Sequence, residues 1–406
     1  NKYKMKALLT LKQTNIIKAT VPVLAEHGVT ITKHFYKRML TAHPELKSVF
    51  NQAHQITGHQ PEALAKAVHA YASNIDNLGA LKGAVERISN KHASLNILPS
   101  QYDIVGKHLL LSIKEVVGDA ATDDVIDAWA AAYGQLAQIM INKEEELMKT
   151  SELKEGGWRG WRKFKVQHTE KESDEITSFY LVPVDGGAVP EFISGQYISV
   201  KKFIPALGFE QPRQYTLSDA PNKKYFRVSV KREDSGSVKG VMSNELHQVL
   251  TPGVEIDVSC PYGVFVLDHD KETPVVLMSG GVGLTPMISM LTSLVQSKSK
   301  RQIRFVHGCR DGKVHAMKDY LNKIVEQHQN VEKVVFYDKV NESDVRGRDY
   351  DYEGFININN IKDKVILPDA DYYLCGPPLF MLAQSKVLEA NGVDPKNIHT
   401  EMFGSA

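Results

Sequence analysis

The 406-residue sequence has few cysteines, no excess of positive or negative charge, and few long hydrophobic runs. Its three cysteines, Cys260, Cys309 and Cys375, are odd in number and far apart. This set argues against a disulfide framework or a thiolate metal site and indicates a reducing compartment. The 49 Lys and Arg residues nearly cancel the 48 Asp and Glu residues. Such a balance gives no electrostatic footprint for nucleic acid or an anionic membrane.

One uncharged run, residues 274–297, is long enough to span a bilayer. Gly280, Gly281, Gly283 and Pro286 interrupt it, so a strand, a glycine turn and a helix is the better interpretation. The first residues lack the long apolar region of a signal peptide. We therefore expect a cytoplasmic protein without a transmembrane segment, and we expect it to be a monomer.

A chain of this length exceeds one hydrophobic core, and three regimes of pattern follow one another along it. Residues 1–149 show helical periodicity, and 150–159 contain a Gly-Gly pair that suggests a linker. Short β-rich runs separated by turns fill 160–268, and apolar strands alternate with helical stretches over 269–406. The sequence thus predicts an all-α domain, an antiparallel β-barrel and an α/β domain with a parallel sheet.

Two glycine- and serine-containing stretches in the second and third domains are suited to phosphate binding. The turn "GGVGLTP", Gly280–Pro286, follows a strand and opens a helix, where glycines and free N–H groups accept a diphosphate. "GVMSNEL", Gly240–Leu246, is expected to present a helix start capped by Ser243. In "RQYTLS", strand alternation places Arg213 and Tyr215 on one face, with the Thr216 hydroxyl adjacent.

With "GQY" at Gly195–Tyr197, "CGPP" at Cys375–Pro378 and "EMFG" at Glu401–Gly404, residues 160–406 resemble the ferredoxin-NADP reductase family. The resemblance implies an FAD site and a nicotinamide-nucleotide site. With Ser243, the FAD site would contain Tyr197, Arg213, Gln214, Tyr215, Thr216, Glu401, Phe403 and Gly404. The NAD(P) site would contain Gly281, Val282, Gly283, Leu284, Thr285, Pro286, Cys375 and Gly376.

Two departures from that family's pattern stand out. Thr216 replaces the commoner serine and keeps the hydroxyl, and Ser405 replaces a common proline just before the last residue, Ala406, so that the tail is expected to be short. The choice between NADH and NADPH stays open, because Arg310 suits a 2′-phosphate but is equally typical of an exposed strand end.

In the N-terminal third, "ERISNKHASL" places His92 on the apolar face that Leu81, Val85 and Ile88 begin. Such a histidine is more often a core residue than a ligand. Two further helices carry polar groups on inward faces: Tyr102 in one, and either Glu144 or Lys143 in the other, since periodicity admits both. A tyrosine and a carboxylate behind a histidine would orient the ring and increase its basicity.

This third resembles a globin, and the whole chain resembles a flavohaemoglobin. The stretches that match are "HFYKRM", "HPELKSVFN", "YASNIDNL", "NKHASL", "QYDIVGKHLL" and "AWAAAYGQLA". The resemblance implies haem b with His92 as the proximal iron ligand and Tyr102 and Glu144 as the relay behind it. It further implies Tyr36, Gln60 and Leu64 on the distal side, with Lys91 and Glu401 between haem and flavin.

Flavohaemoglobins are nitric oxide dioxygenases, so the resemblance implies that NAD(P)H reduces FAD, FAD reduces the haem iron, and O₂ oxidises NO to nitrate. Two alternatives stay open. One is a haem-based oxygen or redox sensor, although no signalling segment is evident beyond the three domains. The other is a haem-assisted reductase of peroxides or lipid hydroperoxides, with an apolar or lipid ligand in a roomy distal pocket. NADH oxidation assays with and without NO separate these functions.

Overall fold

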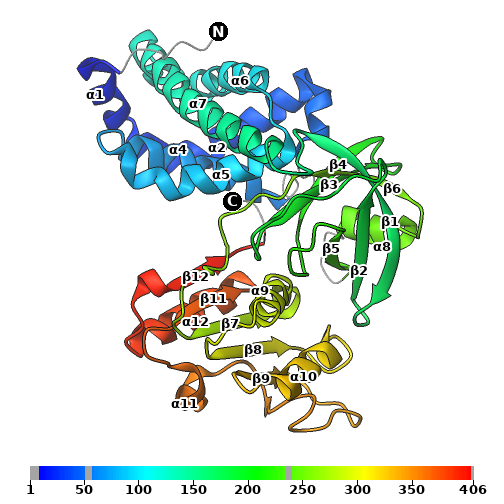
Figure 1. Cartoon of the computed structure of the whole chain (residues 1–406). Helices are drawn as coiled ribbons and strands as arrows, with labels where there is room; N and C mark the ends of the chain where they lie inside the picture. Colours follow the sequence, from blue (N-terminus) through cyan, green and yellow to red (C-terminus); the bar gives the residue numbers. More distant parts are fainter. Residues whose placement is uncertain (1–8, 51–56, 235–239, 404–406) are drawn as a thin grey trace.

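The computed structural model describes residues 9–50, 57–234 and 240–403, and in these ranges three domains follow one another along the chain (Figure 1). A helical domain is followed by an antiparallel barrel and then by an α/β domain with a parallel sheet. The predicted order of folds is thus confirmed. Within the described residues, no helix combines the length and the apolar content needed to cross a bilayer.

The helical domain surrounds a core that contains Phe35, Tyr71 and Trp129. Thr10 caps its first helix through a capping box, and Asn96, in a left-handed conformation, ends the helix that carries His92. The helices are α1 (Leu11–Ala19), α2 (Val21–Ala42), α4 (His59–Ser73), α5 (Lys82–Leu95), α6 (Pro99–Val117) and α7 (Asp123–Glu152). Short 3₁₀ helices are η1 (Pro44–Ser48), η2 (Leu78–Leu81) and η3 (Gly118–Ala120).

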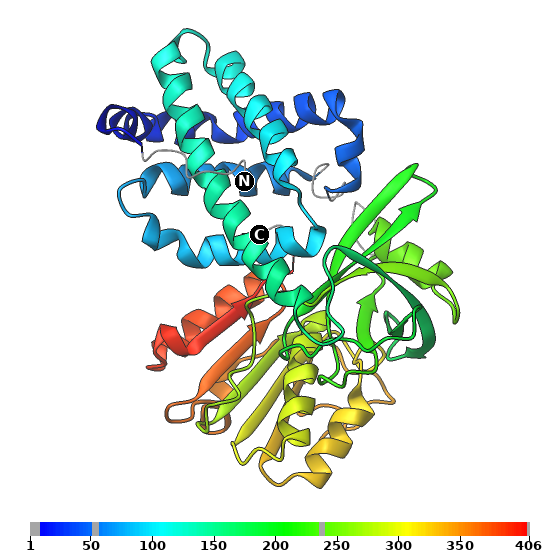
Figure 2. The ribbon, with the colours of Figure 1, turned by 45° about the horizontal axis from the view of Figure 1, so that its top comes forward.

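Helix α4 begins at His59 and carries Pro61 within its first turn, a position that proline tolerates. Helix α7 continues to Glu152, past the expected end at residue 149, because its apolar face stays buried through Met148 against the barrel residues Cys260 and Tyr262. Figure 2 shows α7 crossing the helical domain and ending beside the barrel.

The barrel is a six-stranded sheet in the order β4-β3-β6-β1-β2-β5. Neighbouring strands are antiparallel, and apolar side chains such as Phe164, Phe179 and Phe226 fill the interior. Its elements are β1 (Trp161–Lys171), β2 (Ile176–Pro183), β3 (Tyr197–Ile204), β4 (Phe209–Thr216), β5 (Phe226–Lys231), α8 (Val241–Val249) and β6 (Glu255–Ser259). The sequence pattern did not predict β1, whose outer positions are largely polar.

The α/β domain contains a parallel sheet in the order β10-β9-β8-β7-β11-β12. The strand order reverses between β7 and β11, which is where such sheets bind nucleotides. The strands are β7 (Val275–Gly280), β8 (Ile303–Cys309), β9 (Val331–Tyr337), β10 (Tyr352–Glu353), β11 (Asp371–Cys375) and β12 (Ile398–Glu401). The helices are η4 (Gly281–Gly283), α9 (Leu284–Gln296), α10 (Lys318–Gln327), η5 (Ile358–Asn360), α11 (Lys362–Val365), α12 (Pro378–Ala390) and η6 (Pro395–Asn397).

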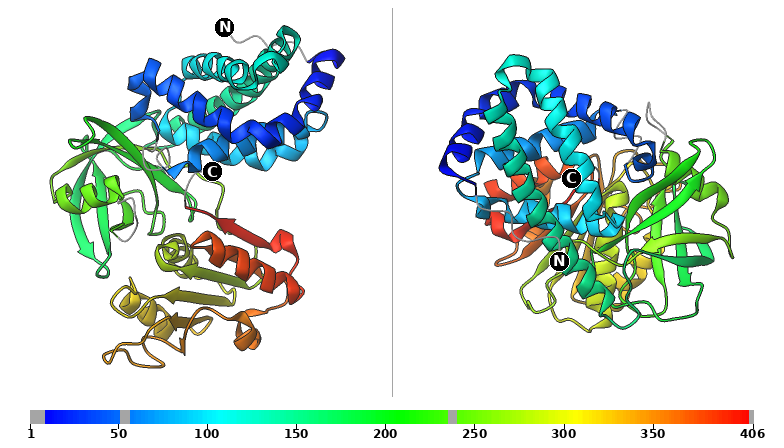
Figure 3. Two further views of the ribbon diagram at one scale, coloured as in Figure 1. Left: turned by 180° about the vertical axis from the view of Figure 1, so that it is seen from behind. Right: turned by 90° about the horizontal axis from the view of Figure 1, so that it is seen from above.

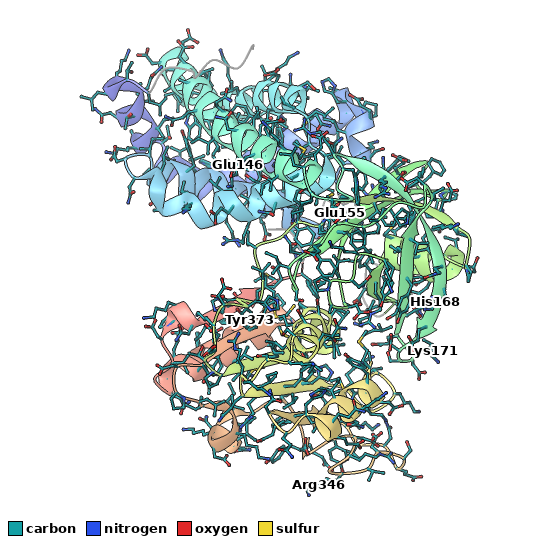
Figure 4. All side chains as sticks on the ribbon, viewed as in Figure 1. Glu146, Glu155, His168, Lys171, Arg346 and Tyr373 are labelled. Atoms are coloured by element: carbon teal, nitrogen blue, oxygen red, sulfur yellow. The ribbon has the colours of Figure 1, made fainter. Side chains whose placement is uncertain are left out.

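Strand β12 brings the C-terminal residues towards the helical domain (Figures 1 and 3). It pairs with β11, so that Glu401 lies opposite Cys375. Tyr373 of β11, labelled in Figure 4, stacks on His399 of β12 with ring centroids 4.7 Å apart. This contact fixes the strand that places Glu401 between the domains.

Candidate functional site

His92 on α5 belongs to a buried hydrogen-bonded network. Its Nδ1 lies 2.9 Å from the Tyr102 hydroxyl and 2.8 Å from Oε1 of Glu144. The Tyr102 hydroxyl donates to the same Glu144 oxygen over 2.5 Å, and Tyr133 donates to the main-chain carbonyl of Tyr102. A carboxylate acceptor keeps the imidazole proton on Nδ1, which leaves the Nε2 lone pair for another partner.

The ambiguity between Lys143 and Glu144 is resolved by burial. Glu144 is 3% exposed, whereas Lys143 pairs with Glu146 on the outside of α7, where Figure 4 labels Glu146. Burial, reinforced by the Glu144 carboxylate, raises the pKa of the Tyr102 phenol. Tyr102 therefore stays protonated at neutral pH and acts as a donor to Glu144.

Tyr36 on α2 is buried in the helical domain among Phe35, Phe50 and Gln60. Its ring meets Phe35 at 4.8 Å and Phe50 at 5.5 Å between centroids, both edge-on. Burial raises the pKa of Tyr36, and a hydrogen bond from the Gln60 side chain opposes the rise. Tyr36 therefore keeps its phenol proton at neutral pH. Leu64, one turn after Gln60, is half-buried at the edge of the same core.

The residues around His92 and those around Tyr36 have the chemistry that a haem requires. His92 offers one nitrogen from a neutral imidazole, the axial ligand of globin-type haem. Across the described residues no cluster of three or more His, Cys, Asp or Glu side chains is suited to a metal ion, and iron held by a porphyrin needs only one such ligand. On the Tyr36 side, Oε1 of Gln60 is buried without a hydrogen-bond partner in the described part of the chain. Only a hydrogen-bond donor would satisfy this oxygen.

Strands β3 and β4 assemble the expected FAD residues. The register pairs Tyr197 with Thr216, Ser199 with Gln214, and Val200 with Arg213. Arg213 and Tyr215 therefore share one face, and Gln214 and Thr216 lie on the other. Burial lowers the pKa of Arg213 to about 10. A guanidinium in such a setting fits a diphosphate.

Ser243 does not cap α8, contrary to expectation. The N-cap residue is Gly240, and the Ser243 hydroxyl turns back to donate to its carbonyl at 3.2 Å. The same hydroxyl accepts from the main-chain N–H of Glu233 at 3.3 Å. The serine thus fixes the start of the helix by backbone contacts within the barrel.

The glycine turn lies at the carboxyl ends of β7 and β11. Gly281 has a φ of +55°, and a Cβ on Gly283 would lie 2.1 Å from the main-chain oxygen of Cys375, so these two glycines allow the close packing of both turns. Burial raises the pKa of the Cys375 thiol. The turn thus brings the expected nucleotide residues to one edge of the sheet: Gly281, Val282, Gly283, Leu284, Thr285, Pro286, Cys375 and Gly376.

Lys91 and Glu401 meet between the helical domain and the α/β domain. Burial lowers the pKa of Lys91 to about 8, with nearby Arg213 adding to the effect and Glu401 opposing it. Burial raises the pKa of Glu401 to about 7, against the attraction of Arg87 and Lys91. Phe403 is exposed, and Gly404, the other predicted FAD residue of the tail, lies outside the described residues, as does Ser405.

Several residues that join the domains were not predicted. Ser199 of β3 donates to Ser94 of α5 over 2.8 Å, and the Gly263 N–H donates to Oδ1 of Asn90. Gln211 of β4 reaches the segment after α2. The one sequence signal for Gln211 is its position two residues before Arg213, which places both side chains on the same face of the strand.

Arg310, left open in the sequence, pairs with Glu175 at the start of β2. A carboxylate therefore already neutralises the guanidinium at the end of β8. This pairing weakens its suitability for a 2′-phosphate.

Comparisons with known proteins agree with this architecture. The globin family model matches residues 33–140, and the model of the oxidoreductase NAD-binding domain matches residues 277–386. A flavohaemoprotein of Bordetella pertussis is 55% identical over 391 residues, covering 96% of this chain and 97% of its own.

Two solved structures are also similar. A flavohaemoglobin from Malassezia yamatoensis with bound FAD and haem has a TM-score of 0.85 and 29% identity, and the match covers 98% of this chain and 100% of that one. The flavohaem-like FAD/NAD-binding domain of the nitric oxide dioxygenase from Vibrio cholerae has a TM-score of 0.55 and 36% identity. That match covers 61% of this chain and 100% of the domain.

Proposed function

The chain belongs to the flavohaemoprotein family, and on this premise we propose that it is an NAD(P)H-dependent nitric oxide dioxygenase that converts NO and O₂ to nitrate. The relative from Malassezia yamatoensis holds FAD and haem, and the domain from Vibrio cholerae belongs to a nitric oxide dioxygenase, which supports the same cofactors and activity here. When bound, FAD takes a hydride from NAD(P)H and delivers single electrons to haem iron, where O₂ is activated.

His92 would hold the haem iron through Nε2, the ring nitrogen that its Nδ1 contacts leave free, and the network behind it would increase electron donation from the ring. Glu144 accepts a hydrogen bond from Nδ1 of His92 at 2.8 Å and a second one from the Tyr102 hydroxyl. The buried carboxylate increases the electron density on the ring, which favours oxygen activation over simple oxygen storage. This carboxylate–imidazole contact is the single observation that carries the proposal.

Tyr36 and Gln60 act on the distal side. The phenol of Tyr36, whose ring packs edge-on against Phe35 and Phe50, would donate a hydrogen bond to a haem ligand that gains negative charge. The unpartnered Oε1 of Gln60 fixes the orientation of polar atoms beside it. Leu64 restricts the space next to them.

The reductase residues bind and orient the two nucleotides. Arg213 would hold the FAD diphosphate, and Tyr197, Gln214, Tyr215 and Thr216, on the paired strands β3 and β4, would contact the flavin. Gly281–Pro286 and Cys375–Gly376 receive the NAD(P) diphosphate and nicotinamide at the switch point of the sheet. Lys91 and Glu401 tune the electrostatic potential between flavin and haem.

Rapid aerobic NADH oxidation that NO accelerates, with nitrate as product, is the result the proposal requires. His92→Ala should lose the haem Soret band and keep the flavin spectrum, whereas His27→Ala, an exposed control on α2, should keep both. NADH consumption that does not respond to NO contradicts the proposed activity. Full haem content in His92→Ala contradicts the ligand assignment.

A second candidate activity is the reduction of lipid hydroperoxides. A cavity of about 520 Å³ lies beside Tyr36 between α2, η1 and α4, lined also by Leu40, Pro44 and Pro61. Lys33, Lys37 and Lys47 stand at the same cavity, so an apolar chain with a carboxylate matches it. Anaerobic NADH oxidation driven by a fatty-acid hydroperoxide tests this activity, and its absence rejects the candidate.

We place the protein in the reducing cytoplasm as a monomer. Cys260, Cys309 and Cys375 are free and buried, which supports such a compartment. Light scattering on the holoprotein tests the monomer, and cell fractionation tests the location.

A further inference from the structure

Gln211 on β4 is a fully buried side chain with partners in two domains. Its Nε2 donates to the main-chain oxygens of Lys47 at 3.0 Å, Phe50 at 3.3 Å and Glu210 at 3.0 Å. Its Oε1 accepts from Nη1 of Arg213 at 3.4 Å. One amide therefore contacts both the end of η1 and the arginine assigned to the FAD diphosphate.

Of the carbonyl groups that Gln211 meets in the helical domain, that of Lys47 belongs to the end of the 3₁₀ helix η1, and that of Phe50 lies two residues beyond it. The last carbonyls of a helix have no partner within it and need donors from elsewhere. Gln211 supplies them from 164 and 161 positions later in the chain. Since the amide is sealed from water, both sides lose their partners together if η1 moves away from β4. The barrel therefore determines where this segment of the helical domain lies.

Phe50 transmits that position to the oxygen side of the pocket. Its ring lies edge-on to Tyr36 at 81° and packs on the core of the helical domain. An edge-to-face contact depends on the placement of both rings. A shift of the Phe50 main chain consequently changes the space around the Tyr36 hydroxyl.

Holding the barrel and the helical domain together does not by itself explain the contacts of Gln211. Two buried contacts, Ser94–Ser199 and Asn90–Gly263, already join the barrel to α5 on the His92 side. Gln211 acts on the opposite side of the pocket. Its link with Arg213 also places it on the FAD-binding face of β4.

We propose that Gln211 is a positioning residue that holds Phe50, and through it Tyr36, in the geometry of the oxygen pocket. The FAD-binding strand then shapes the distal side of the haem site as well as the proximal side. This inference rests on the haem site of the proposed function and does not depend on NO being the substrate.

The test compares Gln211→Ala and Gln211→Glu with the matched control Ser199→Ala in the holoprotein. Glutamate keeps the size of the side chain and its contact with Arg213 but cannot donate to the two carbonyls. The C–O stretching band of the ferrous CO complex reports on donors beside the ligand. We expect both Gln211 variants to shift and broaden this band and to raise the O₂ dissociation rate about three- to tenfold.

Hydrogen exchange provides a second measurement. The amides of residues 45–50 should exchange about three- to tenfold faster in both Gln211 variants, because the end of η1 loses its donor. Ser199→Ala removes a cross-domain hydrogen bond of similar length, yet it should leave the CO band and this exchange unchanged.

An unchanged CO band and O₂ dissociation rate in both Gln211 variants, at full haem and FAD content, overturns the inference. An equal change in Ser199→Ala also overturns it, since general loosening of the domains would then be the cause. If Gln211→Ala loses FAD, Gln211→Glu gives the same comparison with Arg213 still engaged. The band is recorded without turnover, so failure of this inference is distinguishable from failure of the proposed NO chemistry.

Discussion

Replacing Glu144 by glutamine removes the negative charge behind His92 while keeping the volume of the side chain. Glu144 accepts hydrogen bonds from both His92 and Tyr102 and is 3% exposed, so water cannot take its place. Because the carboxylate stabilises the more positive ferric state, its removal should raise the midpoint potential of the haem.

The size of this effect follows from the two hydrogen bonds. A bond to a charged group contributes about 1.5–3 kcal/mol, and one between neutral groups contributes about 0.5–1.5 kcal/mol. Neutralising Glu144 thus weakens its contacts with His92 and Tyr102 by about 2 kcal/mol together. For a one-electron couple, about 59 mV corresponds to a tenfold change in equilibrium. If between half and all of this lost hydrogen-bond energy had stabilised the ferric state relative to the ferrous state, the midpoint potential rises by about 40–90 mV.

Spectroelectrochemical titration of the Soret band measures this shift, and Glu145→Gln is the matched control. Glu145 is the next residue on α7, 56% exposed in its side chain, and pairs with Arg159 on the surface. It should change the midpoint by less than about 10 mV, because exposed ion pairs contribute little. Equal midpoints for Glu144→Gln and the native protein, at full haem content, would refute the assigned role of the His92 network.

Tyr36→Phe should increase the O₂ dissociation rate of the ferrous protein roughly tenfold or more in stopped-flow measurements, because a donor to a charged ligand is lost; an unchanged rate contradicts the donor role. As the pH rises, Glu401 loses its proton near about 7 and Lys91 near about 8, so both are charged only between these values. The rate of haem reduction by FAD should therefore change between these two pH values. Glu401→Gln should remove the step near pH 7. A native rate that stays constant from pH 6 to 9 contradicts this role of the pair. Glu175→Gln should raise kcat/KM for NADPH about three- to tenfold relative to NADH by freeing Arg310 for a 2′-phosphate, and an unchanged ratio shows that Arg310 does not contact the nucleotide.

Periodicity predicted the helical domain and the inward faces that carry His92 and Tyr102, because 3.6 residues per turn constrain which side chains share a stripe. It could not choose between Lys143 and Glu144. Neighbouring positions differ by 100° around a helix, and the choice depends on the rotation that Trp129 and Met140 impose by packing. Tertiary packing, which local sequence does not encode, settled this position.

The start of α8 at Gly240 shows that a strong local preference can also mislead a prediction. The sequence suggested that Ser243 caps α8, since serine is a preferred N-cap residue. In the structure the serine lies within the first turn and bonds back to Gly240 and to Glu233. Serine satisfies backbone groups in several local geometries, so its identity alone does not locate a helix end.

Contacts between domains were the least predictable feature, and they explain why one strand serves two pockets. Gln211, Arg213 and Tyr215 alternate on β4 and therefore face the same way, whatever covers that face. The cover comes from η1, more than 150 residues earlier, and no local pattern specifies it. Once η1 docks, the strand that carries the proposed flavin residues also contacts the Phe50 segment. On the proposed function, one strand would therefore position residues of both redox sites, and a substitution at Gln211 should disturb O₂ binding before it disturbs flavin binding.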